Sequence, residues 1–188
     1  TTLFRSGPDG EPVPIQTRTL STWTPDRRHV RWLLLDFQAD LPAGGSRAYH
    51  LQTQPAEPGP VPDSPVTAEE TAERVTVDTG PLEFTLRRNV PDFWESIRVS
   101  SEDGRRELVG DRRPGLQMKD HDGRVYDSRF GSLPARIEVE ECGPMRACVR
   151  VSGYHVSESG LRFCPYILRI HAFAGRSDIR VNHTYVFD

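Results

Sequence analysis

The sequence predicts an all-β protein, folded as an antiparallel β-sandwich or barrel-like domain with long loops and little helix. Almost every ordered segment alternates apolar and polar residues with a period of two, and clusters of Gly, Asp, Pro and Ser separate these segments. The segment richest in helix-favouring Ala and Glu, residues 65–75, has only a thin apolar stripe. Short strands at hairpin spacing, without helices between them, are typical of antiparallel sandwiches and barrels.

The N-terminal part of the chain contains two distinctive segments. VRWLLLDFQ, residues 30–38, is almost continuously apolar and predicts a strand that is covered on both faces. QPAEPGPVPDSP, residues 54–65, carries five prolines among twelve residues and predicts a loop or linker. Within one all-β domain, residues 1–188, this linker separates an N-terminal hairpin group, residues 1–53, from a main sheet, residues 66–188.

The later segments each predict a strand with one apolar side. These sides are formed by Leu82, Phe84 and Leu86, by Ala135, Ile137 and Val139, by Met145, Ala147, Val149 and Val151, and by Ile179, Val181, His183, Tyr185 and Phe187. The opposite faces of the last strands carry Arg146, Arg150, Arg169, His171, Arg180 and Asn182. Neighbouring strands would join these residues into a cationic surface suited to an acidic sugar chain. Alternatively, Glu138 and Glu140 pair with the arginines in an ordinary surface ladder, the interpretation we favour.

Composition and charge exclude several classes of function. The formal net charge is −3 and no basic run occurs, so nothing indicates a nucleic-acid partner. No apolar segment approaches the roughly 20 residues that cross a bilayer, so we expect no membrane span. The first residues form no apolar signal core, so an export signal is either removed or absent. Because the sequence ends on a strand-like segment, we expect it to be cut from a longer polypeptide.

The three cysteines, Cys142, Cys148 and Cys164, contain no CxxC pair and lie in or beside strand-like segments. This placement favours buried, inert thiols. A disulfide between Cys148 and Cys164 across neighbouring strands is the alternative, and it would indicate an oxidising compartment.

Three segments resemble exo-rhamnogalacturonan lyases: TPDRRHVRWLLLDFQADLPAGGSRAYHLQ at 24–52, TGPLEFTLRR at 79–88 and RIHAFAGRSDIRVNHTYVFD at 169–188. These are secreted polysaccharide lyases of bacteria and fungi, in which an all-β N-terminal region precedes a large α-helical toroid. The resemblance implies that the chain is this N-terminal region of a bacterial, extracytoplasmic carbon–oxygen lyase. It also implies an acidic polysaccharide as substrate, a C-terminal helical domain of the same polypeptide as partner, and no activity for the fragment by itself.

The chemistry implied by the resemblance is β-elimination at the galacturonate of rhamnogalacturonan, the pectin backbone. A cation neutralises the carboxylate, a base removes the proton at C5, and an acid assists the leaving oxygen at C4. Lys119 is the single lysine among 24 Lys and Arg residues, and lysine, unlike arginine, can release its proton and act as a base. Lys119 is therefore the candidate base. The alternative is a solvated lysine beside a plain turn.

His121 and Tyr126 complete the candidate catalytic group. If residues 115–119 form a strand and residues 121–123 a tight turn, Tyr126 returns on the paired strand near Lys119. The alternatives are an exposed turn histidine and a half-buried strand tyrosine.

Three residues are candidate substrate ligands. Arg112 and Arg113 offer guanidinium forks to a uronate carboxylate, or else lie in a solvated loop. Trp94, like Trp23, borders a turn and could offer its ring to a sugar, although such rings are more often packed. Trp32, within the apolar segment 30–38, is expected in the core.

Metal binding has only a weak signal in the sequence. Asp120 and Asp122 precede Gly123 as in a calcium loop, but the further ligands and closing Glu of an EF-hand are absent. Pectin lyases often use calcium, so the family resemblance allows this cofactor. We assign no metal ligand.

Overall fold

The structure is a computed structural model that describes residues 2–7, 10–26, 28–54, 59–111, 113–130 and 134–186. Within these ranges it contains fifteen strands and no helix, which confirms the all-β prediction. The strands are β1 (Thr2–Ser6), β2 (Gln16–Thr22), β3 (Val30–Asp36), β4 (His50–Gln54), β5 (Thr67–Glu70), β6 (Arg74–Asp78), β7 (Leu82–Arg87), β8 (Trp94–Ser101), β9 (Gly104–Glu107), β10 (Gln117–Lys119), β11 (Val125–Asp127), β12 (Arg136–Cys142), β13 (Arg146–Ser157), β14 (Arg162–Phe173) and β15 (Ile179–Tyr185). None of the described residues belongs to a helix with the length and apolar character of a membrane span.

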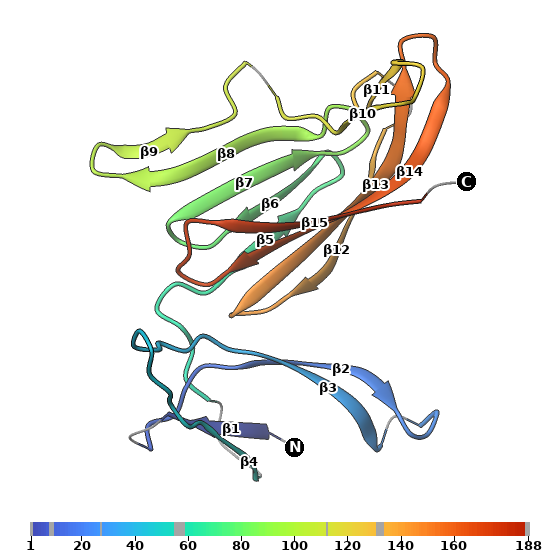
Figure 1. The fold of residues 1–188 in the computed structure, drawn as a ribbon. Coiled ribbons are helices and arrows are strands. Elements are labelled where there is room, and N and C mark those ends of the chain that lie inside the picture. The colour runs from blue at the N-terminus through green and yellow to red at the C-terminus, as the bar shows by residue number, and fades with distance from the viewer. Residues whose placement is uncertain are drawn as a thin grey trace.

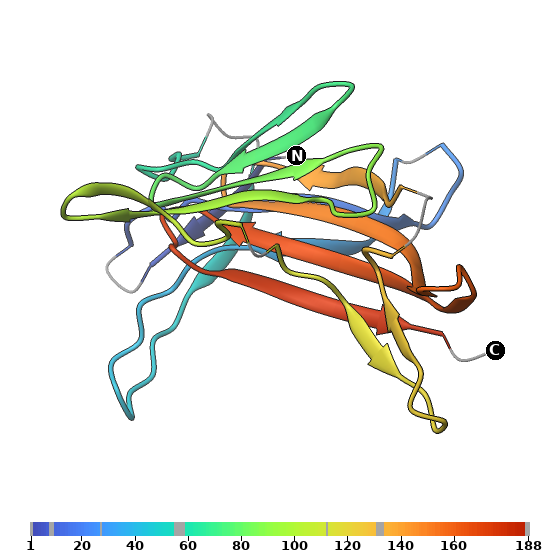
Figure 2. The ribbon, with the colours of Figure 1, turned by 90° about the horizontal axis from the view of Figure 1, so that it is seen from above.

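Two antiparallel sheets form a sandwich (Figures 1 and 2). Strands β5 to β9 follow one another as a five-stranded meander. The six-stranded sheet has the order β10-β11-β13-β14-β15, with β12 also paired to β13. Strand β12 accompanies β13 as far as Arg136 opposite Ser152, and β11 pairs with β13 at Val156 and Ser157. The β13 positions between these two pairings therefore lie in a gap between β12 and β11.

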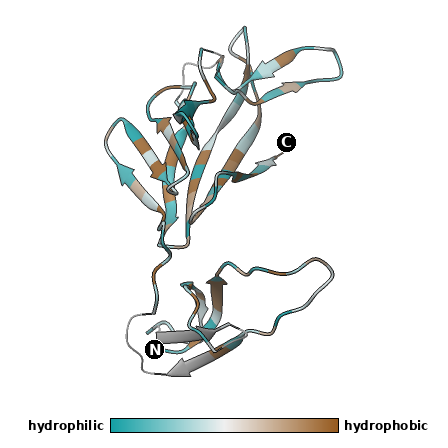
Figure 3. Cartoon of the chain, turned by 90° about the vertical axis from the view of Figure 1, so that its left-hand side faces the viewer, coloured by the Kyte–Doolittle hydropathy of each residue, from teal (hydrophilic) through white to brown (hydrophobic). Residues whose placement is uncertain are grey.

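The core lies between the facing sides of the two sheets, and the alternating pattern of the sequence produces it. Phe84 and Leu86 of β7 and Ile170 of β14 are fully buried, while their sequence neighbours lie nearer the surface. Val149 of β13 is also fully buried, although its neighbour Cys148 is buried as well. Figure 3 shows the resulting alternation of hydrophobic and hydrophilic residues along these strands. Burial of each such side chain contributes roughly 2 kcal/mol, so the patterning largely specifies which faces meet.

The N-terminal part forms two separate two-stranded sheets, β1–β4 and β2–β3. Strand β3 was expected to be covered on both faces, and this expectation is wrong because Trp32 is 62% exposed and Val30 is also exposed. Along β3 the first three residues are exposed and the remaining four are only partly buried, so neither face of Val30–Trp32 is covered. The division into a hairpin group, a linker and a main sheet remains a prediction.

A polar junction attaches the β2–β3 ribbon to the six-stranded sheet. The side chain of Gln16 donates to the Arg146 carbonyl (3.0 Å) and accepts from the Arg146 N–H (2.8 Å). The Arg146 guanidinium is nearly buried and lies 3.2 Å from Asp36 and 2.5 Å from Glu141. Burial raises the pKa of the Asp36 carboxyl, with Arg146 acting in the opposite direction. We name this group (Gln16, Asp36, Glu141 and Arg146) the arginine junction.

Candidate functional site

The hairpin of β10 and β11 carries the three predicted catalytic residues. Asp120 organises its turn, because one carboxylate oxygen accepts hydrogen bonds from the N–H groups of Asp122 (3.0 Å) and Arg124 (2.8 Å). Its other oxygen accepts from the Tyr126 hydroxyl at 3.2 Å. Tyr126 also packs on Phe163, with ring centroids 4.8 Å apart. Asp120 therefore holds the turn, and the contact of Tyr126 with Phe163 anchors the hairpin to β14.

The catalytic candidates share this hairpin without sharing a cavity. Tyr126 does return on the strand paired with β10, but it lies opposite Met118, and only 3% of it is exposed. Lys119 lies opposite Val125 and is exposed. The His121 side chain is 89% exposed, with Nε2 3.2 Å from an Asp122 oxygen. Lys119 and His121 thus face solvent while Tyr126 is buried, and their catalytic roles remain predictions.

The structure describes only one of the two arginines that were predicted to bind a substrate carboxylate, Arg112 and Arg113. Arg112 lies outside the described residues. Arg113 is half-buried, and its guanidinium lies 3.2 Å from Asp92, which also pairs with Arg87 at 3.5 Å. Burial raises the pKa of the Asp92 carboxyl, although Arg87 opposes the shift. Because Asp92 already occupies Arg113, a substrate carboxylate would have to compete for this guanidinium.

Trp94, a candidate substrate ligand, takes the packed position that the sequence indicated as the more common one. Only 7% of Trp94 is exposed, and its ring packs against Phe84 and Phe93 at centroid distances of 6.0 and 5.7 Å. Trp94 begins β8 opposite Leu86, on the core side of the meander. This ring cannot stack on a sugar, whereas the rings of Trp23 and Trp32 on the β2–β3 ribbon are exposed.

The arginines on the outer face of the six-stranded sheet form the favoured ladder with glutamates. Arg150 lies 3.3 Å from Glu138, and Arg169 makes a bidentate pair with Glu140 at 2.7 and 2.9 Å. The hydrogen bonds from Arg169 lower the pKa of the Glu140 carboxyl. The prediction of paired charges is therefore confirmed for Arg150 and Arg169, whose charges are compensated by Glu138 and Glu140.

Arg146 and His171 depart from the surface position expected of them. Arg146 belongs to the arginine junction, and its Nη1 donates to His171 Nδ1 at 3.1 Å. Burial, followed by the neighbouring Arg146 charge, lowers the pKa of His171. This part of the face therefore connects the ribbon to the sheet and offers no open cation.

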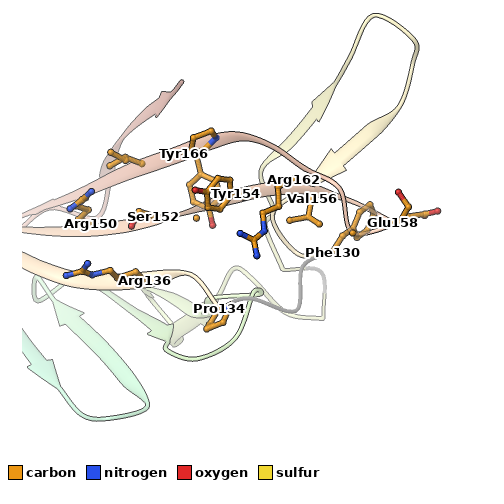
Figure 4. A pocket seen from close by; sticks show the side chains of 15 residues that line it. Phe130, Pro134, Arg136, Arg150, Ser152, Tyr154, Val156, Glu158, Arg162 and Tyr166 are labelled. Atoms are coloured by element: carbon orange, nitrogen blue, oxygen red, sulfur yellow. The ribbon is translucent and has the colours of Figure 1, made fainter. Parts of the chain in front are cut away.

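A groove of about 870 Å³ lies where β12 and β11 leave the edge of β13 (Figure 4). Its floor and walls include Arg136, Arg150, Ser152, Tyr154, Arg162 and Ile167. Tyr154 is 44% exposed, and the Arg162 guanidinium carbon lies 5.4 Å from the centre of its ring. Hydroxyl, guanidinium and aromatic groups in a cavity of this size can bind a sugar oligomer.

Sequence reasoning missed Tyr154 and Arg162 as site residues. Tyr154 follows Gly153 at the end of an alternating segment, which marks it as surface-facing. Its proximity to Arg162 depends on how β13 and β14 pair, and that pairing is invisible in the sequence.

The alternative disulfide between Cys148 and Cys164 is not formed. Cys148 pairs with His171, seven residues along β14 from Cys164, or about 23 Å at strand spacing. A disulfide needs Cα atoms about 6 Å apart. Burial raises the pKa of the Cys148 thiol to about 11, which makes it unreactive as predicted. Cys164 is also buried, whereas Cys142 is exposed, so the prediction of a buried thiol is wrong for Cys142.

Metal ligands do not gather in the described ranges, where no group of three or more His, Cys, Asp or Glu could hold an ion. Asp120, the first aspartate of the calcium-like turn, uses both carboxylate oxygens within its own hairpin. The turn is therefore held by its own hydrogen bonds.

These features define an antiparallel β-sandwich with a groove of about 870 Å³ on one sheet. Residues 66–188 match the family described as "PcRGLX-like protein central beta sandwich domain". The chain belongs to this rhamnogalacturonan lyase-like family. The "Uncharacterized protein YetA" of Bacillus subtilis (strain 168) is 27% identical over 134 residues, which are 69% of this chain. The matched part is 15% of the length of that relative.

Proposed function

We propose that this chain is the substrate-binding β-sandwich of a polysaccharide lyase that cleaves rhamnogalacturonan by β-elimination. The groove beside Tyr154 carries the proposal, because it combines an exposed aromatic ring with three arginines in a member of this family. An acidic polysaccharide is the ligand that such a surface suits. The proposal includes an extracytoplasmic location and a helical domain in the same polypeptide, both of which rest on the family resemblance.

The catalytic part of the proposal concerns Lys119. A lysine becomes a base when desolvation or neighbouring cations lower its pKa. Lys119 is exposed on the β10–β11 hairpin, which extends from the sheet in Figure 2. Its role as the base therefore requires another part of the full-length protein to cover this hairpin, with substrate between them.

The test has two parts. Galacturonate-containing oligosaccharides should bind residues 1–188 in calorimetric titrations, and failure to bind would contradict the binding role. In the full-length protein, cleavage of rhamnogalacturonan is followed by absorbance of the unsaturated product. Lys119→Ala should abolish this signal, with His29→Ala, an exposed substitution on the N-terminal ribbon, as the control. Unchanged turnover in Lys119→Ala would show that Lys119 is not the base, while the proposed substrate-binding role of the domain would stand.

A second candidate is a structural module that packs against another domain. The exposed rings of Trp23 and Trp32 favour it, since large apolar side chains at the surface often mark an interface. Replacing both with Ser in the full-length protein should then lower its melting temperature, while leaving that of residues 1–188 unchanged.

A further inference from the structure

A β-bulge determines which side chains meet in the groove. Tyr154 pairs with Pro165, but the next pair is His155 with Phe163, so Cys164 is an extra residue in β14. Cys164 has a φ of 39°, a conformation that non-glycine residues rarely adopt. Without the bulge the register would place Arg162 opposite Ser157, on the other face of the sheet. With the bulge, Arg162 pairs with Val156 and shares the face of Tyr154.

The three groove arginines differ in their charge partners. Arg136 and Arg150 both pair with Glu138. Arg162 makes no ion pair with a described carboxylate, and its guanidinium stays over the Tyr154 ring. A guanidinium that lies over an aromatic ring keeps the N–H donors at the edge of the guanidinium plane available for a ligand. Among the groove arginines of the described chain, Arg162 is thus the one with an uncommitted charge.

We propose that Arg162 and Tyr154 form a subsite for one uronate residue of the polysaccharide. The guanidinium fork of Arg162 binds the uronate carboxylate, and the Tyr154 ring contacts an apolar C–H face of the sugar. Figure 4 shows the two side chains together in the groove. This inference rests on the proposed function, because it assigns the acidic sugar of that polysaccharide to a place in the same groove.

Two neighbours shape the specificity of this subsite. Ile167 lines the groove on the next strand and offers apolar contact to the sugar ring. Glu158 also lines the groove, and its negative charge disfavours a second carboxylate nearby. The groove therefore offers the uronate a cation from Arg162 and an apolar wall from Ile167.

The experiment is calorimetric titration of residues 1–188 with a galacturonate-containing rhamnogalacturonan oligosaccharide and with its carboxyl-reduced, neutral counterpart. Arg162→Gln should weaken binding of the acidic ligand roughly tenfold or more, the loss of a charge-assisted bidentate contact. The matched control is Arg106→Gln, which removes an equal charge from exposed strand β9 of the other sheet and should change affinity by about twofold or less. Arg162→Lys keeps the charge without the fork and should give an intermediate loss.

Further measurements separate this subsite from the general proposal. Tyr154→Ala should weaken both ligands, because the ring contacts the sugar face, and Arg162→Gln should leave the neutral ligand unaffected. Circular dichroism of each variant checks folding. Acidic-ligand binding that is equally weakened by Arg162→Gln and Arg106→Gln would overturn the subsite and leave the proposed function standing. No binding of either ligand by the unaltered chain would overturn both.

Discussion

The most direct test of the packing beneath the groove is Gly153→Ala. A Cβ at residue 153 would lie 2.7 Å from the Tyr166 hydroxyl oxygen and 2.9 Å from Cζ of the same ring. Tyr166 is directly opposite Gly153 in the β13–β14 pairing, and its ring is buried in the core. The ring crosses the space above the glycine, so the added methyl group must displace it.

The expected magnitude follows from two opposing effects. Overpacking of a well-filled core costs about 2 kcal/mol. Alanine in a strand recovers roughly 0.5 kcal/mol relative to glycine. The net loss of about 1.5 kcal/mol should lower the melting temperature by roughly 3–6 °C in a chain of this size.

Urea and thermal unfolding of residues 1–188 measure this loss. Gly59→Ala is the matched control, because no atom lies within 4 Å of its added Cβ and its stability should not fall. Tyr166→Phe in the Gly153→Ala background removes the closest contact and should recover part of the loss. Equal stability of Gly153→Ala and Gly59→Ala would refute the close approach of Tyr166.

Two further predictions concern charged groups. Arg146→Met should lower the free energy of unfolding by about 3 kcal/mol in urea titrations, because Asp36 and Glu141 lose their shared partner in a partly buried junction; retained stability would show that the junction is energetically unimportant. Desolvation raises the pKa of Glu107, but hydrogen bonds from Ser96 and two backbone N–H groups outweigh it and lower that pKa from 4.5 to about 2. A lowered pKa stabilises the fold above pH 4.5, and this stabilisation is lost as the pH falls towards 2. Glu107→Gln should flatten this part of the pH–stability curve, and an unchanged slope would contradict the assignment.

The alternating strands were predictable because the period of side chains along a strand is a local property. Leu82 and Phe84, and later Val149 and Val151, occupy the core as their spacing indicates. The pairing of outer-face arginines with Glu138 and Glu140 was also foreseen, since adjacent strands bring polar faces together. Alternating patterns therefore determined the fold class and the orientation of these strands.

The exposure of the tryptophans was not predictable, because it depends on how many layers cover a strand. Trp32 lies in an apolar segment yet belongs to a two-stranded ribbon, whereas Trp94 borders a turn yet enters the sandwich core. The arginine junction could not be predicted from the sequence either, because Asp36 and Arg146 are far apart along the chain.

By itself the sequence determined an all-β sandwich, the buried apolar faces of strands such as β7 and β13, and a charged outer face, because each of these follows from residue spacing along single strands. The apolar side predicted for residues 179–187 is wrong at Val181 and Tyr185, which are 45% and 47% exposed. The tertiary structure alone decided where a ligand could bind. A one-residue bulge at Cys164 brings Arg162 to the face of Tyr154, and the divergence of β12 and β11 opens the groove beside them. Strand register and sheet edges arise from contacts between distant segments, and no local pattern encodes them.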